Sequence, residues 1–269
     1  MNDILVATLA IGIMGLILGG GLAYASKVFA VEKDPKIEEV RDVLPGANCG
    51  GCGFPGCDAL AEAIVNGKAK LNQCPVGGAE VAAKIGAIMG MEVDTSVKNV
   101  ALVSCKGCGD NVTQKFEYYG VKDCREAVIA MGGDKGCTYG CMGYGTCVAA
   151  CKFDAIHIND CGIAEVNPKK CTACGACISV CPKSVIRLVP DPKTVHVMCN
   201  SHDKGKDVTS VCKVGCIACG ICVKNCPHDA IKIAEGTNLP AIDYAKCVEC
   251  GICVEKCPKK TIIQMAKKQ

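Results

Sequence analysis

Residues 212 to 227 read CKVGCIACGICVKNCP, and the spacing of the cysteines in this stretch decides the fold. Cys216, Cys219 and Cys222 follow a CxxCxxC spacing, and Cys226 comes after three further residues and before a proline. The same unit recurs through the second half of the chain, in four copies that end at Cys151, Cys181, Cys226 and Cys257. Such self-similarity indicates a repeated structural unit.

This spacing indicates iron–sulfur clusters. Three closely spaced thiolates cannot all form good disulfides with one another, but they can occupy three corners of an iron–sulfur cube. CxxCxxCxxxCP is the pattern of bacterial ferredoxins, in which the fourth cysteine ligates the other cluster of a pair. The copies therefore pair as two ferredoxin-like modules with two 4Fe–4S clusters each. Alternating stretches at residues 155–158 and 230–233 predict short strands, and helices are expected after the third cysteines.

The crossed pairing predicts four ligand sets. In the first module these are Cys137, Cys141, Cys147 with Cys181, and Cys171, Cys174, Cys177 with Cys151. In the second module they are Cys216, Cys219, Cys222 with Cys257, and Cys247, Cys250, Cys253 with Cys226. The first copy departs from the pattern, because its cysteines follow a looser Cx3Cx5C spacing and Lys152 replaces the proline. We expect an altered loop geometry there.

A fifth ligand set lies upstream, in LPGANCGGCGFPGCDALAEAIVNGKAKLNQCPVGG at residues 44–78. A predicted helix that stops at Gly67 brings the distant cysteine back to the three closely spaced ones, so the set is Cys49, Cys52, Cys57 and Cys74. The surrounding Gly and Pro residues let backbone N–H groups turn toward the sulfurs. A zinc site is the alternative here, because thiolate spacing alone does not choose between the metals.

Six of the 26 cysteines remain outside these sets: Cys105, Cys108, Cys124, Cys161, Cys199 and Cys212. Cys105 and Cys199 each end an apolar run, and each is followed by a second spare cysteine upstream of a ferredoxin module. We predict that Cys105, Cys124, Cys199 and Cys212 hold an additional cluster between the modules, with Cys108 as a competitor of Cys105. The alternative is that these are buried thiols packed as small hydrophobes.

The N-terminal residues differ in character from the rest. Residues 4–26 carry no charge and would span roughly 34 Å as a helix, which predicts a transmembrane helix. A cleaved secretory signal is the alternative, although the acidic start and the long apolar run disfavour it. Lys27, Lys33 and Lys36 follow this segment while only Asp3 precedes it, so the remainder is expected in the cytoplasm.

Composition narrows the function. A net charge of +3 is too small for a typical nucleic-acid binder. Large aromatic side chains are scarce, and each module is too short to bury enough apolar area on its own. We therefore expect the clusters to stabilise the fold of each module. The chain has no P-loop and no nucleophile motif, so we expect no catalytic residue and no NAD site on it. A series of five clusters, or six, is typical of an electron carrier.

The predicted fold class is therefore an α+β multi-module iron–sulfur protein. Its segments are a transmembrane helix (1–30), a small helical 4Fe–4S domain (31–92), a linking region with spare cysteines (93–136), a first ferredoxin-like module (137–198), an inter-module segment (199–215) and a second module (216–269).

These motifs together resemble the B component, an iron–sulfur subunit, of the Rnf complex, which is a membrane-bound ion-translocating ferredoxin:NAD oxidoreductase. The resemblance rests on the glycine-rich apolar segment, CGGCGFPGC, KGCTYGCMGYGTCVAAC and the two ferredoxin modules, and it covers the whole chain in order. It implies that the chain takes low-potential electrons from soluble ferredoxin on the cytoplasmic side of the cell membrane. Other membrane and peripheral subunits would then pass electrons toward NAD, coupled to Na⁺ or H⁺ transport.

Other functions share these modules. One alternative is a polyferredoxin-like electron-transfer subunit of another membrane-bound oxidoreductase or hydrogenase, and another is an iron–sulfur sensor or assembly scaffold. A basic rim near the last cluster could steer an acidic ferredoxin, so that electrons enter at the C-terminal module and leave through the Cys49 cluster. Its members are Lys256, Lys259, Lys260, Lys267 and Lys268, and the alternative is that they merely solvate an exposed helix.

Overall fold

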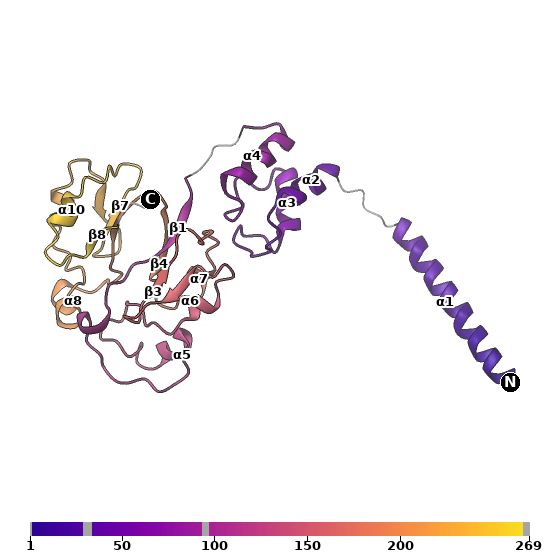
Figure 1. Ribbon diagram of the computed structural model, residues 1–269, viewed down its shortest axis with the longest axis horizontal. Helices are drawn as coiled ribbons and strands as arrows, with labels where there is room; N and C mark the ends of the chain where they lie inside the picture. The colour runs from indigo at the N-terminus through magenta and orange to yellow at the C-terminus, as the bar shows by residue number, and fades with distance from the viewer. Residues whose placement is uncertain (1, 29–33, 93–96, 266–269) are drawn as a thin grey trace.

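The computed structural model describes residues 2–28, 34–92 and 97–265. Its first element is helix α1 (Asn2–Val28) (Figure 1). The large apolar side chains described between residues 9 and 24 are exposed, with Leu16 and Leu22 more than 70% exposed. None of the helices formed by the described residues combines the length and the apolar character needed to cross a membrane. The predicted transmembrane span is therefore not confirmed.

Three helices form a small separate core next in the chain: α2 (Pro35–Val43), α3 (Cys57–Val65) and α4 (Gly78–Met89). Asp34 caps α2 by accepting from the backbone N–H of Lys36, and Gly90 ends α4 in the left-handed conformation. Val40, Leu60 and Ile85 are at most 1% exposed where the helices meet. This core also contains buried cysteines, so the domain is built around its candidate metal site.

The first ferredoxin-like module has two small antiparallel sheets. Strand β1 (Asn99–Val103) pairs with β4 (Ile186–Pro190), and β2 (Ile156–Ile158) pairs with β3 (Ala164–Val166) as a hairpin. Helices α6 (Thr146–Ala149) and α7 (Ala176–Ser179) pack beside them.

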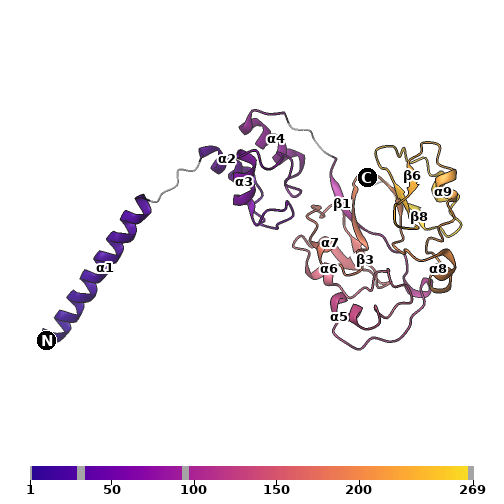
Figure 2. The ribbon, with the colours of Figure 1, turned by 180° about the vertical axis from the view of Figure 1, so that it is seen from behind.

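The second module repeats this arrangement. Strand β5 (Val195–Val197) pairs with β8 (Ile262–Gln264), and β6 (Ile231–Ile233) pairs with β7 (Pro240–Ile242). Its helices are α9 (Ile221–Lys224) and α10 (Ile252–Glu255). The strands predicted at residues 155–158 and 230–233 are thus present, and the two modules lie side by side in both views (Figures 1 and 2).

Each module extends beyond the segment that the sequence analysis assigned to it. Strand β1 lies in the predicted linking region but completes the first module, because it pairs with β4. Strand β5 lies at the end of the predicted first module but belongs to the second, because it pairs with β8. Pairing of the first and last strands is non-local, and cysteine spacing carries no information about it.

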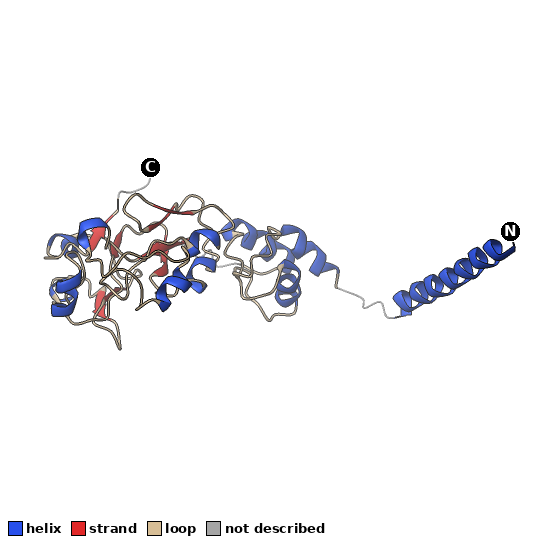
Figure 3. Ribbon diagram, turned by 90° about the horizontal axis from the view of Figure 1, so that it is seen from below, coloured by secondary structure: helices blue, strands red, loops and turns tan. Residues whose placement is uncertain are grey.

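The segments between strands and ligand runs carry short elements: η1 (Gly109–Asn111), α5 (Cys124–Ile129) and α8 (Gly205–Val211). Residues 111–113 run alongside residues 211–213, where the Thr113 N–H donates to Val211 O and the Lys213 N–H donates to Asn111 O. The two modules are therefore joined by their inserted segments, and loops make up much of this region (Figure 3).

The four short helices share one start signal. A glycine with positive φ precedes each of them: Gly145, Gly175, Gly220 and Gly251. This glycine stands two residues before the third cysteine of its copy, so the third cysteine lies inside the helix. The expectation that helices begin after the third cysteines is wrong, because the turn at glycine already starts each helix one residue before that cysteine.

Candidate metal centres

In the second module the predicted cysteines gather around two cavities. Cys216, Cys219, Cys222 and Cys257 line a cavity with about 420 Å³ of empty space. Cys226, Cys247, Cys250 and Cys253 line a second cavity of about 340 Å³. Both sets cross the module as the ferredoxin pattern predicts, since each combines three cysteines of one copy with the last cysteine of the other.

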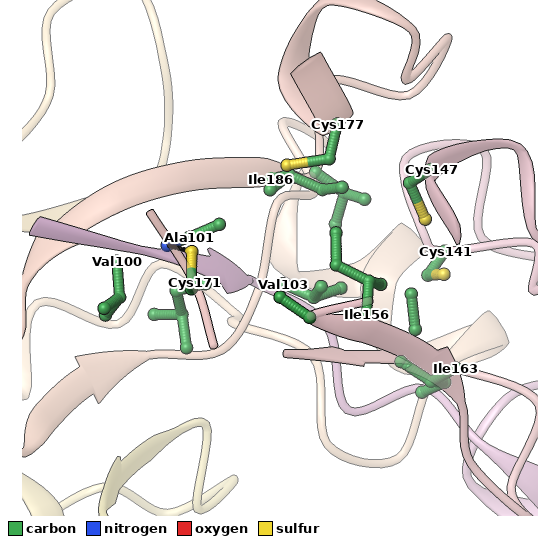
Figure 4. Close-up of a cluster of buried hydrophobic side chains, with 14 of the residues drawn as sticks. Val100, Ala101, Val103, Cys141, Cys147, Ile156, Ile163, Cys171, Cys177 and Ile186 are labelled. Carbon is green, nitrogen blue, oxygen red and sulfur yellow. Dashed lines mark hydrogen bonds between the residues drawn. The ribbon is translucent and has the colours of Figure 1, made fainter. Parts of the chain in front are cut away.

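In the first module one predicted set also comes together. Burial raises the pKa of Cys177 to about 11, and the neighbouring thiols of Cys171, Cys174 and Cys151 contribute to this rise. Figure 4 shows Val103, Ile156 and Ile186 packed between this region and the pair Cys141 and Cys147. Buried apolar side chains thus pack against Cys141, Cys147, Cys171 and Cys177, which are themselves buried.

Backbone N–H groups point at these sulfurs in a repeated manner. In three copies the residue four positions after the last cysteine donates its N–H to that sulfur: Ala155 to Cys151 and Ala230 to Cys226, each over 3.4 Å, and Thr261 to Cys257 over 3.3 Å. Such hydrogen bonds stabilise negative charge on sulfur and tune the potential of a cluster. The sites are therefore arranged for thiolates.

Three of the four predicted ligands of the helical domain, Cys52, Cys57 and Cys74, lie near one another. Burial raises the pKa of Cys74, the N–H groups of Gly77 and Val76 lower it, and the thiols of Cys57 and Cys52 raise it again. Gly77 donates to Cys74 Sγ over 3.4 Å. The loop before α3 is fixed because the Cys57 N–H donates to Asn48 Oδ1 over 2.8 Å and Gln73 Nε2 donates to Cys52 O over 3.1 Å.

The irregular first copy differs from the prediction. The cavity beside Cys141, Cys147 and Cys181 has about 330 Å³ of empty space, and its fourth cysteine is Cys124. Cys137, which the sequence analysis placed in this set, lines a different cavity. Burial raises the pKa of Cys147 to about 12, and the thiols of Cys141, Cys124 and Cys181 contribute to this rise.

The cavity that Cys137 lines has about 410 Å³ of empty space and also contains Cys105, Cys199 and Cys212. Cysteine spacing alone predicts Cys124 in place of Cys137 at this site. The sequence contains a signal for the position of Cys137, because CTYGC at residues 137–141 has the same spacing as CKVGC at residues 212–216. When the copies are aligned on their last cysteine, Cys137 and Cys212 do not fall at equivalent positions.

Cys108 and Cys161 stand apart from the four cavities described above. Cys161 is exposed, Cys108 lies beside it, and a hydrogen bond with Cys108 raises the pKa of Cys161. Within residues 2–28, 34–92 and 97–265, no group of three or more His, Cys, Asp or Glu side chains is placed to hold a single metal ion, the ferredoxin sets included.

The residues nevertheless fit iron–sulfur clusters. Burial leaves several of the thiols with a high pKa, about 11 at Cys216 and Cys253. A ligand of iron must be a thiolate, so the positive charge of the iron has to offset this cost of burial. The crossed cysteine sets, the cavities of similar size and the N–H donors together supply the donor set of a cluster.

Comparison with known families agrees with this chemistry. Residues 44–76 match the family model described as a putative Fe-S cluster, residues 164–187 match a 4Fe-4S binding domain, and residues 215–261 match a 4Fe-4S dicluster domain. The irregular copy that begins at Cys137 lies outside these ranges.

Three curated relatives resemble the chain over most of its length. The B component of the Na(+)-translocating ferredoxin:NAD(+) oxidoreductase complex of Acetobacterium woodii is 54% identical over 91% of this chain and 73% of its own. The B component of the ion-translocating oxidoreductase complex of Methanosarcina acetivorans is 49% identical over 87% and 89%. The B component of the proton-translocating ferredoxin:NAD(+) oxidoreductase complex of Clostridium ljungdahlii is 42% identical over 90% and 85%. The chain therefore belongs to the B component family of ion-translocating ferredoxin:NAD oxidoreductase (Rnf) complexes.

Proposed function

We propose that this chain is the electron-transfer subunit that carries electrons from reduced ferredoxin through a series of 4Fe–4S clusters toward NAD reduction coupled to Na⁺ or H⁺ transport. The observation that carries the proposal is the set of four cysteine-lined cavities formed by the two ferredoxin-like modules and their inserted segments. Each cluster, when bound, takes up and releases one electron.

The protein residues determine where those electrons can go. Five ligand sets are proposed: four in the two ferredoxin-like modules and one, with Cys49, Cys52, Cys57 and Cys74, in the helical domain. The helical domain contacts the first module at Gly51, where an added Cβ would lie 2.5 Å from the Cys174 carbonyl oxygen. Loops of two ligand sets thus touch, which supports transfer between the helical domain and the Cys171, Cys174, Cys177 set.

The donor is proposed to bind near the C-terminus. Lys256 and Lys260 are exposed beside the last cysteine of the second module, and Lys259 is half-buried there. Lys267 and Lys268, which the sequence analysis added to this basic rim, lie outside the described residues. A basic surface favours encounter with an acidic ferredoxin, so electrons would enter here and leave through the helical domain.

Attachment to the membrane is proposed through the N-terminal segment. The uncharged run at residues 4–26 and the exposed apolar side chains of α1 support contact with lipid or with other membrane helices. The lysines that follow the run support a cytoplasmic position of the cluster-bearing domains in a single-pass arrangement. Ion transport is assigned to partner subunits, because residues 4–26 contain no acid or base that could form an ion path.

The test is ferredoxin-driven NAD reduction by the purified membrane complex, with and without an ion gradient. The proposal predicts NAD reduction that depends on this chain and responds to the gradient. A complete complex that reduces another acceptor but not NAD would instead support the alternative, an electron-transfer subunit of a different membrane-bound oxidoreductase or hydrogenase.

A further inference from the structure

We propose that Cys105, Cys137, Cys199 and Cys212 ligate a sixth 4Fe–4S cluster between the two ferredoxin-like modules, and that Cys124 completes the set of Cys141, Cys147 and Cys181. The inference deepens the proposed function and rests on it only for the role of this cluster. Its presence and its ligands are tested by counting iron, which requires no electron donor or acceptor.

The four cysteines come from two equivalent halves of the molecule. Cys105 follows β1, the first strand of one module, and Cys199 follows β5, the first strand of the other. Cys137 and Cys212 each open a CxxGC sequence whose second cysteine is the first ligand of a ferredoxin set. Each module thus supplies one cysteine after its first strand and one before its first ligand.

The N–H donors around these sulfurs are duplicated in the same way. Gly107 donates to Cys105 Sγ over 3.4 Å, and Ser201 donates to Cys199 Sγ over 3.5 Å. A second donor comes from the first ferredoxin ligand of each module. The Cys141 N–H bonds the sulfur of Cys105, and the Cys216 N–H bonds that of Cys199 over 3.3 Å. Spare thiols packed as hydrophobes would have no need of matched donors.

The other two sulfurs show the same duplication. N–H groups of Tyr139 and Gly140 face Cys137, and those of Val214 and Gly215 face Cys212. An added Cβ at Gly140 would lie 3.6 Å from Cys137 Sγ and 3.7 Å from Cys105 Sγ, so these two sulfurs border one point.

The empty space bordered by these four cysteines is similar in volume to that at one of the predicted ligand sets of the second module. Its empty space of about 410 Å³ compares with about 420 Å³ at the Cys216, Cys219, Cys222 and Cys257 set, which lies in a range matched by the 4Fe-4S dicluster family. Val112 and Cys212, which form a β-bridge, close the void from the two inserted segments. Lys135 also lines the void and brings a positive charge next to it.

The exchange of Cys124 for Cys137 explains the irregular spacing of the first copy. Tyr144 stands where the second module has its middle ligand, Cys219, because both residues are three positions before the third cysteine. The residue before each has positive φ, 82° at Gly143 and 55° at Ala218, so the loops have the same form. Since tyrosine cannot serve as the thiolate ligand, a cysteine from elsewhere must complete the set.

Cys124 is held in the position to do so. It is the first residue of α5, and its N–H donates to Thr146 Oγ1 over 2.7 Å, next to the third ligand Cys147. Cys124 also lines the same cavity as Cys141, Cys147 and Cys181. The first copy is therefore a ferredoxin site whose middle ligand has moved to an inserted helix.

A cluster with ligands from both modules would carry electrons from one module to the other. When bound, a cluster held by Cys105, Cys137, Cys199 and Cys212 would accept one electron from a reduced cluster of one module and pass it to a cluster of the other, with reduced ferredoxin as the source. The shared site thus replaces a direct transfer between modules that are otherwise joined by their inserted segments.

Iron and acid-labile sulfide per chain, measured on anaerobically purified full-length protein, test the assignment. Six clusters require about 24 iron atoms, and Cys137→Ala or Cys212→Ala should each leave about 20. The double variant Cys137→Ala/Cys212→Ala should also leave about 20, because both residues serve one cluster, whereas Cys124→Ala/Cys212→Ala should leave about 16. Cys161→Ala is the matched control and should retain the full count.

Two results would overturn the proposal. About 20 iron atoms in the unmodified chain, unchanged in Cys212→Ala, would mean that the four cysteines are spare thiols. A loss of about eight irons in Cys137→Ala/Cys212→Ala, with about four in Cys124→Ala/Cys212→Ala, would restore the assignment made from spacing alone.

A rescue variant separates loss of a ligand from loss of the fold. If Tyr144 occupies the place of a ligand, Tyr144→Cys added to Cys124→Ala should return the iron count to that of the unmodified chain. The matched comparison is Tyr144→Cys added to Cys137→Ala, which should not recover iron. Recovery with Cys137→Ala but not with Cys124→Ala would contradict the assignment. Native mass spectrometry would confirm that whole clusters are gained and lost.

Discussion

The contact between the helical domain and the first module makes a sharp prediction for Gly51→Ala. The new Cβ would lie 2.5 Å from Cys174 O, 2.9 Å from Cys174 Cα and 3.0 Å from Cys174 Cβ. Two of these atoms belong to the backbone and cannot rotate away, so the loops must separate by about 0.9 Å to restore an ordinary contact of 3.4 Å. No positive φ at Gly51 complicates the change, so its effect is purely one of space.

Overpacking of this kind costs about 1 to 3 kcal/mol, which lowers the equilibrium constant for docking of the two loops roughly 5- to 150-fold. Electron transfer from the first module to the Cys49 cluster should slow accordingly, while iron content stays constant. The assay is freeze-quench EPR of the unmodified and variant chains after mixing with reduced ferredoxin. Glu62→Ala, an exposed position on α3 of the same domain, is the control. An unchanged rate in Gly51→Ala would refute the idea that this contact carries the electrons.

Three further predictions concern the basic rim, the buried side chain of His196 and the core of the helical domain. Lys256→Glu/Lys260→Glu should slow reduction by ferredoxin at low salt, and the effect should disappear as added salt screens the charges. The control, Lys68→Glu/Lys70→Glu in the helical domain, should not slow reduction. Equal rates of reduction in the two variants would exclude the basic rim as the docking site. His196, 2% exposed, contacts Tyr244 OH through Nδ1 at 2.8 Å and Lys193 O through Nε2 at 3.0 Å, so His196→Phe should cost about 1 to 3 kcal/mol for each partner left unpaired. Thermal unfolding measures this cost, and an unchanged Tm would contradict it. Leu60→Ala, at a side chain 1% exposed, should cost about 2 to 5 kcal/mol and release the iron of the helical domain, about four atoms. Full iron content after Leu60→Ala would show that the cluster alone holds that domain together.

Cysteine spacing predicted what depends on local sequence. The CxxCxxCxxxCP copies at Cys216 and Cys247 line cavities with the predicted crossed sets, because the turns between ligands are set by neighbouring residues. The residue before the middle cysteine has positive φ in both copies, at Ala218 and Glu249, so the two ligand loops share this backbone conformation. The strands at β2 and β6 followed from the alternation of apolar residues in the same way.

What spacing could not predict depends on contacts between distant residues. The pairing of β1 with β4 and of β5 with β8 joins residues far apart in sequence, so the predicted module boundaries fell inside the modules. The position of Cys124 depends on the hydrogen bond between its N–H at the start of α5 and Thr146 Oγ1. This contact joins residues far apart in sequence, so cysteine spacing could not predict it. An alignment on CxxGC instead of on the last cysteine would have paired Cys137 with Cys212.

The most direct test of the account is reduction of the purified full-length chain by reduced ferredoxin under anaerobic conditions. The account predicts that the visible iron–sulfur absorbance bleaches and that EPR signals of reduced 4Fe–4S clusters appear at a rate that falls with added salt. If dithionite reduces the clusters while reduced ferredoxin leaves them oxidised at every salt concentration, the chain does not receive electrons from ferredoxin and the central claim is contradicted.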